Sequence, residues 1–184
     1  MQDKKTLYYS IKLGIFAVLA ILVFVFRETL LENLKYFIGG LMLLYGVEEI
    51  AFEIIYSGKH FYHKDKVYLG TMELILGVTL LVAPFSFEAV CVIWGTWSII
   101  RESYEIKEVI AEMEFLVPRI ISGLESIVVI IFSIELIINQ DHHGAMTHMY
   151  LLLVELVLTP LVPLLEEILL KRKQKKEQKE DPSK

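Results

Sequence analysis

Six long apolar segments constrain the fold of this chain more than any other feature of its sequence. The hydrocarbon core of a bilayer is ~30 Å thick, and about 20 helical residues are needed to cross it. The six segments have about that length and cover residues 8–26, 36–56, 67–87, 89–106, 116–138 and 149–170. Because lipid offers the backbone no hydrogen-bond partner, such segments satisfy their own backbone groups as α-helices. We therefore predict an all-α membrane protein with six transmembrane helices.

The composition excludes several other classes of protein. Hydrophobic residues make up 55% of the 184 residues and charged residues 22%, which is more apolar surface than one small soluble core can bury. The formal net charge of −5 argues against a nucleic-acid partner, because phosphate binding needs a basic surface. The single cysteine, Cys91, excludes an intrachain disulfide and a zinc site built from several cysteines. The expected partner is the lipid bilayer.

The lysines and arginines predict the orientation of the chain. Of the 18 basic residues, all but Arg27 and Lys35 lie on one side of the predicted spans: near the amino terminus, around the second and fourth connections, or in the tail. Positive charge is retained on the cytoplasmic side of a membrane. We therefore expect both termini inside a bacterial cytoplasmic membrane, with a six-helix domain over residues 1–170 and a basic cytoplasmic tail over 171–184.

The spans also group into three helical hairpins of similar size, which cover residues 8–56, 67–106 and 116–170. Each hairpin begins with a basic residue and, a few residues later, a glycine, at Gly14, Gly70 and Gly123. We interpret this pattern as an internal repeat. Small residues allow helices in a membrane to approach closely. We expect such contacts, within the chain or in a homo-oligomer, at these glycines: Gly39, Gly40, Gly46, Gly70, Gly77 and Gly95.

The middle hairpin resembles the short repeat of the HdeD-like acid-resistance membrane proteins. The matching positions are Gly70, Gly77, Pro84 and Gly95. The resemblance implies six membrane helices built from repeated hairpins, and a non-enzymatic protein associated with acid or envelope stress in bacteria.

Ionisable residues inside the predicted spans are the main candidates for a functional site. A charge at the centre of a bilayer costs roughly 2.5–3.5 kcal/mol on insertion scales, so each should be paired, protonated or turned toward protein or water. The predicted polar layer consists of Glu48, Glu49, Glu73, Arg101, Glu102, Arg119 and Glu125. Glu155 is expected nearer the outer side. The end residues Glu53, Glu105, Glu166 and Glu167 are expected to reach water.

Two mechanisms are open for this layer. In the first, Arg101 and Arg119 neutralise carboxylates such as Glu73, and the ion pairs fix the packing of the helices. In the second, carboxylates in excess of the arginines bind and release protons. The second mechanism gives an alternative function, a small proton or cation transporter or channel that uses Glu49, Glu73 and Glu125. A protein that only assembles with others is a third class.

Histidines cluster in the last predicted outer loop, at His142, His143 and His148 beside Asp141. They are polar loop residues without a special task, a group that gains charge as the exterior acidifies, or ligands of a divalent metal. The sequence contains no recognised metal or cofactor motif, and Ser98 and Ser103 have no histidine on a neighbouring helical turn. We therefore expect no metal site, no cofactor and no enzymatic activity.

Overall fold

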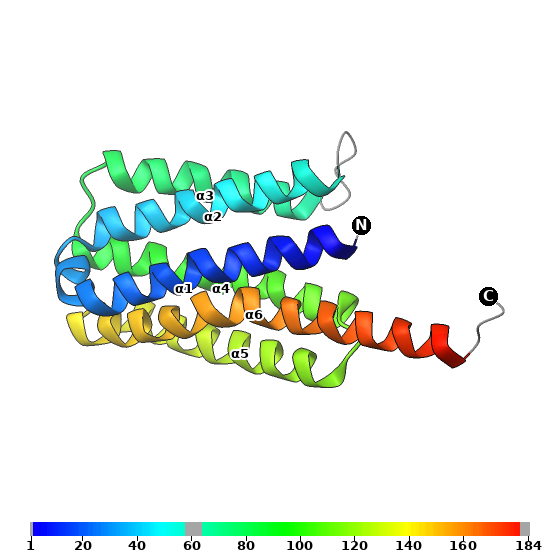
Figure 1. Cartoon of the computed structure of the whole chain (residues 1–184). Helices are drawn as coiled ribbons and strands as arrows, with labels where there is room; N and C mark the ends of the chain where they lie inside the picture. Colours follow the sequence, from blue (N-terminus) through cyan, green and yellow to red (C-terminus); the bar gives the residue numbers. More distant parts are fainter. Residues whose placement is uncertain (1, 58–63, 181–184) are drawn as a thin grey trace.

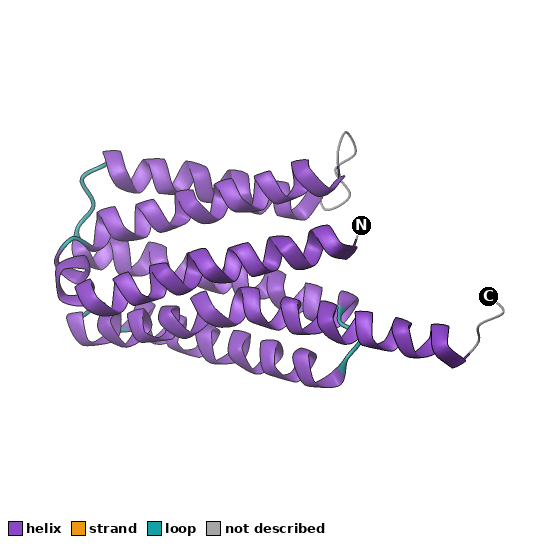
Figure 2. Cartoon of the chain, in the orientation of Figure 1, coloured by secondary structure: helices purple, strands orange, loops and turns teal. Residues whose placement is uncertain are grey.

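The computed structural model describes residues 2–57 and 64–180, and this part of the chain is helical with no strand. The helices are α1 (Gln2–Glu32), α2 (Leu34–Ser57), α3 (Lys64–Val82), α4 (Phe87–Glu112), α5 (Leu116–Ile138) and α6 (His142–Glu180). The short connections between them are visible as loops in Figure 2. The prediction of an all-helical chain with six long helices is confirmed.

The helices lie side by side along one common direction, and each runs opposite to the preceding one (Figure 1). Both termini lie at one end of the bundle, which we call the termini end. The connections α1–α2, α3–α4 and α5–α6 lie at the opposite end, and α6 extends beyond the bundle at the termini end (Figure 1).

The helix pairs that pack most extensively are α2 with α3, α4 with α5, and α1 with α6. By contrast, α1 and α2, which form the predicted first hairpin, make few contacts. The glycines of the predicted repeat also differ in their surroundings. A Cβ atom on Gly14 or Gly123 would meet no described atom within 4 Å, whereas one on Gly70 would lie 2.9 Å from the carbonyl oxygen of Gly46. The internal repeat remains a prediction.

Glycines explain the close approach of α2 and α3. A Cβ on Gly39 would lie 3.1 Å from the carbonyl oxygen of Gly77, and one on Gly77 would lie 2.8 Å from that of Gly39. Gly46 and Gly70 repeat this relationship seven residues away along each helix. Two antiparallel helices therefore touch backbone to backbone at two levels, which only residues without a Cβ permit.

Two of the other glycine expectations have different outcomes. Gly95 of α4 packs against α5, where an added Cβ would lie 2.7 Å from the carbonyl oxygen of Ser133. Gly40 makes no close contact within the described chain, because no described atom lies within 4 Å of a Cβ built there, and a contact of Gly40 in a homo-oligomer stays a prediction.

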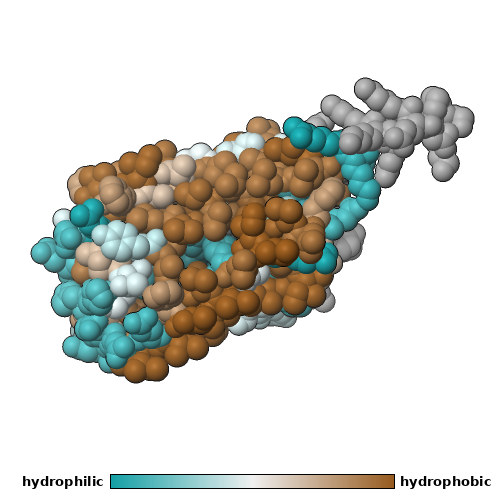
Figure 3. Space-filling model, turned by 90° about the horizontal axis from the view of Figure 1, so that it is seen from below, coloured by the Kyte–Doolittle hydropathy of each residue, from teal (hydrophilic) through white to brown (hydrophobic). Residues whose placement is uncertain are grey.

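Among the described residues, two helices combine the length and the apolarity needed to cross a membrane. They are Thr6–Glu32, with a mean hydropathy of 2.4, and Leu116–Ile138, with 2.2. Large apolar side chains are exposed on all six helices, and Figure 3 shows a broad apolar surface along the bundle with hydrophilic residues gathered toward its two ends. Surface of this extent and apolarity is unusual for a water-soluble monomer.

The boundaries of α6 correct the predicted ends of the last span. The helix begins at His142 and continues through Pro160 and Pro163 to Glu180, so the predicted outer loop is shorter and most of the predicted tail is helical. The inner-loop residues at 58–63, with Lys59, and the last residues, with Lys184, lie outside the described part of the chain.

Candidate functional site

Arg101 of α4 is the centre of the candidate site and has only 2% of its surface exposed. Its Nη1 lies 3.6 Å from Oε1 of Glu73 on α3. Its Nη2 lies 3.4 Å from Oε1 of Glu105, one turn later on α4, and its Nε lies 3.4 Å from Oε1 of Glu155 on α6. One guanidinium thus connects three helices by ion pairs. We call Arg101, Glu73, Glu105 and Glu155 the arginine cluster.

Aromatic side chains enclose this cluster. The guanidinium carbon of Arg101 lies 3.5 Å from the ring centroid of Tyr45 on α2, a cation–π contact that adds a fourth helix. Trp97 donates a hydrogen bond of 3.0 Å from Nε1 to Oε1 of Glu73, and its ring lies 5.7 Å from that of Tyr45. Tyr45 and Trp97 are both buried. The rings therefore separate the cluster from the apolar core and hold Glu73 in place.

Negative charge exceeds positive charge in the arginine cluster. Its one guanidinium faces three carboxylates, and those of Glu73 and Glu155 are buried. An uncompensated buried charge costs several kcal/mol. Ionisation of all three carboxylates at once is therefore costly in the absence of a further positive charge.

The position of Glu155 corrects the prediction that it lies apart from the polar layer, nearer the outer side. Because α6 begins at His142, Glu155 lies deeper in the bundle than the predicted span allows and meets Arg101. Arg119 is the opposite case. It is exposed and donates a hydrogen bond to the carbonyl oxygen of Met113, so it does not belong to the buried layer.

Glu102 and Glu125, on α4 and α5, are buried without a described ion-pair partner. Neither side-chain oxygen of Glu102 has a hydrogen-bond partner within the described residues, nor does Oε1 of Glu125. Of the predicted layer, the structure therefore brings Glu73 and Arg101 into the arginine cluster, whereas Glu102 and Glu125 form no ion pair with an arginine.

Glu48 and Glu49 differ although they are neighbours on α2. Glu48 accepts a hydrogen bond of 2.9 Å from the ammonium of Lys12 on α1. Glu49 instead lines a cavity at the termini end. Glu53, one turn later, is fully buried, so the expectation that it reaches water is wrong.

Glu166 and Glu167, near the end of the last predicted span, are also less exposed than predicted. Glu166 has 8% of its surface exposed, and its Oε1 accepts backbone hydrogen bonds from Glu114 at 2.7 Å and Phe115 at 3.2 Å. It thereby ties the connection before α5 to α6. Glu167 is buried as well.

A cavity of about 310 Å³ leads from the termini end to the arginine cluster, and all six helices contribute to its wall. Polar residues in the wall include Lys12, Glu49, Lys66, Arg101 and Glu105. Sequence reasoning missed this cavity, because a space between six helices depends on how they pack. The two prolines of α6 were the available signal, since Pro163 lies in the wall and a proline leaves a carbonyl of the preceding turn unbonded.

Lys66 lies at the start of α3, outside the predicted spans, and forms an ion pair of 2.6 Å with Glu108 of α4. Burial is the largest single influence and lowers the pKa of Lys66, but the attraction of the Glu108 and Glu49 carboxylates and the hydrogen bond to Glu108 together outweigh it and raise the pKa above its ordinary value. Lys66 therefore stays charged and paired.

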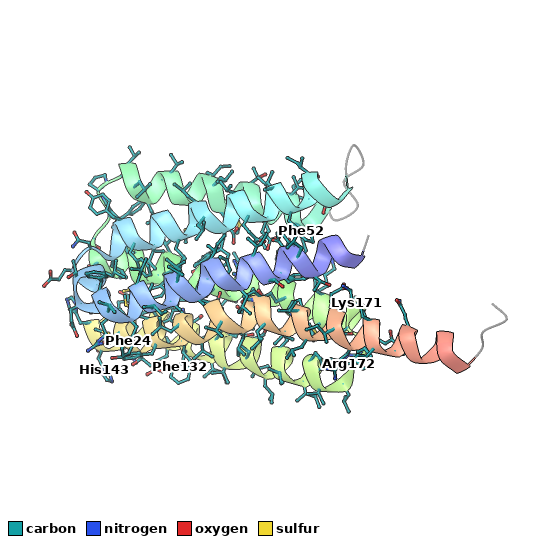
Figure 4. The ribbon with its side chains drawn as sticks, viewed as in Figure 1. Phe24, Phe52, Phe132, His143, Lys171 and Arg172 are labelled. Atoms are coloured by element: carbon teal, nitrogen blue, oxygen red, sulfur yellow. The ribbon has the colours of Figure 1, made fainter. Side chains whose placement is uncertain are left out.

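The predicted histidine cluster is divided by the structure. His142 and His143 are exposed, and His143 lies at the end of the bundle opposite Lys171 and Arg172 (Figure 4). The ring of His142 stacks on Phe87 with a centroid distance of 4.4 Å. His148 is instead a buried residue of α6, so its assignment to the outer loop is wrong.

His148 of α6 lies against α4 and contacts Ser98 across the two helices, a neighbour that the search for a histidine on an adjacent helical turn does not find. The distance from Ser98 Oγ to His148 Nε2 is 3.2 Å, and Trp94 packs edge-on against the imidazole at 4.6 Å. A catalytic triad needs a third group that orients the histidine, and Nδ1 of His148 has no hydrogen-bond partner among the described side chains. Among the residues that the structure describes, no group of three or more His, Cys, Asp or Glu side chains could hold a metal ion.

No known protein family, no curated protein and no solved structure matches this chain.

Proposed function

We propose that this chain is a non-enzymatic protein of a bacterial cytoplasmic membrane, with six transmembrane helices and both termini inside, that binds and exchanges protons at the arginine cluster. The protons, or a small cation in their place, enter through the cavity at the termini end. This function is the alternative that the sequence leaves open, a small transporter or channel for protons or cations.

The distribution of polar groups supports membrane insertion of all six helices. The helices that carry intramembrane acids turn Glu73, Arg101 and Glu155 into the bundle, while large apolar side chains remain outside. Lipid solvates such an exterior. Lys66, Lys171 and Arg172 belong to the termini end, which is the basic end and therefore the cytoplasmic one.

The observation that carries the proposal is the cavity that ends on a buried cluster with excess carboxylates. Glu105 both lines the cavity and contacts Arg101, so a proton reaches Glu105 first and the buried Glu73 and Glu155 next. Protonation of either buried acid weakens its attraction to Arg101. Because Glu73 and Glu155 belong to α3 and α6, proton binding changes how these helices are held to α4.

The test is proton flux into proteoliposomes, followed with a pH-sensitive dye. We expect flux in the wild-type protein and its loss in Glu73→Gln and Glu155→Gln, since glutamine keeps the shape of the side chain but binds no proton. Glu135→Gln is the matched control, because Glu135 is exposed on α5. Flux that survives both substitutions, or its absence in the wild type, would refute the proposal.

A role in acid or envelope stress, implied by the HdeD-like resemblance, is a second proposal. Its physical support is the presence of buried carboxylates, which respond to proton concentration. A deletion strain should then grow more slowly at low external pH, and the wild-type gene should restore growth whereas Glu73→Gln should not. Equal growth of deletion and parent strains would contradict this role.

A further inference from the structure

We propose that the cavity at the termini end binds an organic cation, a molecule with one ammonium or amine group joined to an apolar or aromatic part. This inference rests on the proposed function, because it names the solute that shares the cavity with protons.

The charges around the cavity favour a cation. The ammonium of Lys12 is paired with Glu48 at 2.9 Å, and that of Lys66 with Glu108 at 2.6 Å. These pairs leave little positive charge for an anion.

The remaining charged groups favour a cation more strongly. Arg101 faces three carboxylates, and Glu49 lines the cavity without an ion-pair partner among the described residues. The wall itself carries four basic residues, Lys12, Lys66, Arg101 and Lys107, and three acidic ones, but Glu48, Glu73 and Glu155 also pair with Lys12 and Arg101. Carboxylates therefore outnumber basic groups around the cavity, and Glu49 and Glu105 reach its wall. A cation placed there gains the attraction of the Glu49 carboxylate, which acts on Lys12 and Lys66 only at longer range and forms no ion pair with them.

The remaining wall fits an organic cation better than a bare metal ion. Tyr9 and Tyr104 contribute aromatic rings, and Leu69 and Val109 contribute aliphatic side chains. Aromatic faces attract ammonium groups, whereas a metal ion needs several oxygen ligands at short distances. The volume of about 310 Å³ is at the lower end of the ~300–1000 Å³ of ligand pockets, which suits a small organic molecule.

The experiment is calorimetric titration of the full-length protein in detergent with benzyltrimethylammonium, with benzoate and sodium chloride as comparison probes. We expect saturable binding of the ammonium probe, and none of benzoate. Glu49→Gln should weaken binding about tenfold, the effect of losing one ion pair worth about 1.4 kcal/mol. Glu135→Gln, the same change at an exposed site, should leave affinity unchanged.

A second pair of variants tests the aromatic contact. Tyr104→Phe should keep the affinity because the ring is retained, and Tyr104→Leu should reduce it severalfold. Tyr68→Leu is the control, because Tyr68 is exposed on α3. Every variant in both series must give a circular-dichroism spectrum like that of the wild type, so that unfolded variants are recognised.

The outcomes separate this inference from the proposed function. Binding of benzoate in place of the ammonium probe, or equal affinity in wild type and Glu49→Gln, overturns the organic-cation assignment even where proton flux is measured. Binding of the ammonium probe without any proton flux supports the cavity assignment and refutes proton exchange. Binding of sodium alone identifies an inorganic cation site and overturns the inference.

Discussion

Gly46 and Gly70 lie so close that a Cβ on Gly46 would be 2.6 Å from the carbonyl oxygen of Gly70. The obstacle is backbone, which cannot move aside as a flexible side chain can. This contact brings α2 against α3, and α3 carries Glu73 one turn beyond Gly70 toward Arg101. The spacing of two helices and the position of a buried carboxylate therefore depend on one missing methyl group.

Gly46→Ala should destabilise the protein by about 1–3 kcal/mol, because the added methyl overpacks the interface. Gly40→Ala is the control, because the neighbouring Gly40 has open space around it and alanine is the better helix former. Thermal unfolding in detergent, followed by circular dichroism, measures both. Equal melting temperatures for the two variants would contradict the close contact of α2 and α3.

The glycines show what a sequence can and cannot predict about helix packing. Their frequency in apolar segments predicts close contacts, and Gly46 and Gly70 make them. Which face of a helix meets which neighbour is a tertiary property, so the sequence alone does not distinguish Gly46, which contacts α3, from Gly40, which faces open space within the chain. For the same reason the sequence predicted packing within hairpins, whereas α1 packs mainly against α6.

Arg101→Leu should destabilise the protein by about 3–5 kcal/mol, because it leaves buried carboxylates without their counter-ion. The double change at Glu73 and Glu155 to glutamine, combined with Arg101→Leu, should recover part of that loss, since it removes the orphaned charges. The measurement is the free energy of unfolding in mixed micelles. An Arg101→Leu protein as stable as the wild type would show that the cluster does not hold the helices together.

Part of this cluster could be predicted from the sequence. Arg101 and Glu105 are four residues apart on one helix, and that spacing alone places them on one face. The partnership with Glu155 could not be predicted, because it depends on α6 starting seven residues earlier than the predicted span. That earlier start also turned His148 from a loop residue into a buried neighbour of Ser98.

Ser86→Ala should cost about 1 kcal/mol of unfolding free energy, the usual effect of losing an N-cap. Ser86 Oγ accepts a 3.3 Å hydrogen bond from the backbone N–H of Ala89 at the start of α4. Chemical denaturation in detergent measures the difference. Ser103→Ala is the control, since its hydroxyl donates only to a carbonyl within the helix. A Ser86→Ala protein no less stable than Ser103→Ala would contradict the cap.

Glu88, two residues after Ser86, adds a pH dependence to this helix start. Its own backbone N–H and the Ser86 hydroxyl hold the pKa of the Glu88 carboxyl below its ordinary value of 4.5. A lowered folded-state pKa stabilises the fold above pH 4.5, and this contribution is lost as the pH falls through the lowered value. Glu88→Gln should therefore reduce stability near neutral pH and have no effect in strong acid. The free energy of unfolding is measured by denaturation at both pH values. A larger loss of stability in strong acid than near neutral pH would contradict the assignment.

The proposed topology predicts that His143 and Gln174 lie on opposite sides of a membrane, because both belong to α6 and one lies at each end of the bundle. Cys91, the only native cysteine, is buried, so single cysteines introduced elsewhere can be labelled against a low background. In intact spheroplasts a membrane-impermeant maleimide should label His143→Cys and should label Gln174→Cys only after lysis. Wild-type protein provides the background signal. Labelling of both variants before lysis would mean that lipid does not separate the two ends, and the cavity at the termini end would then not face the cytoplasm alone.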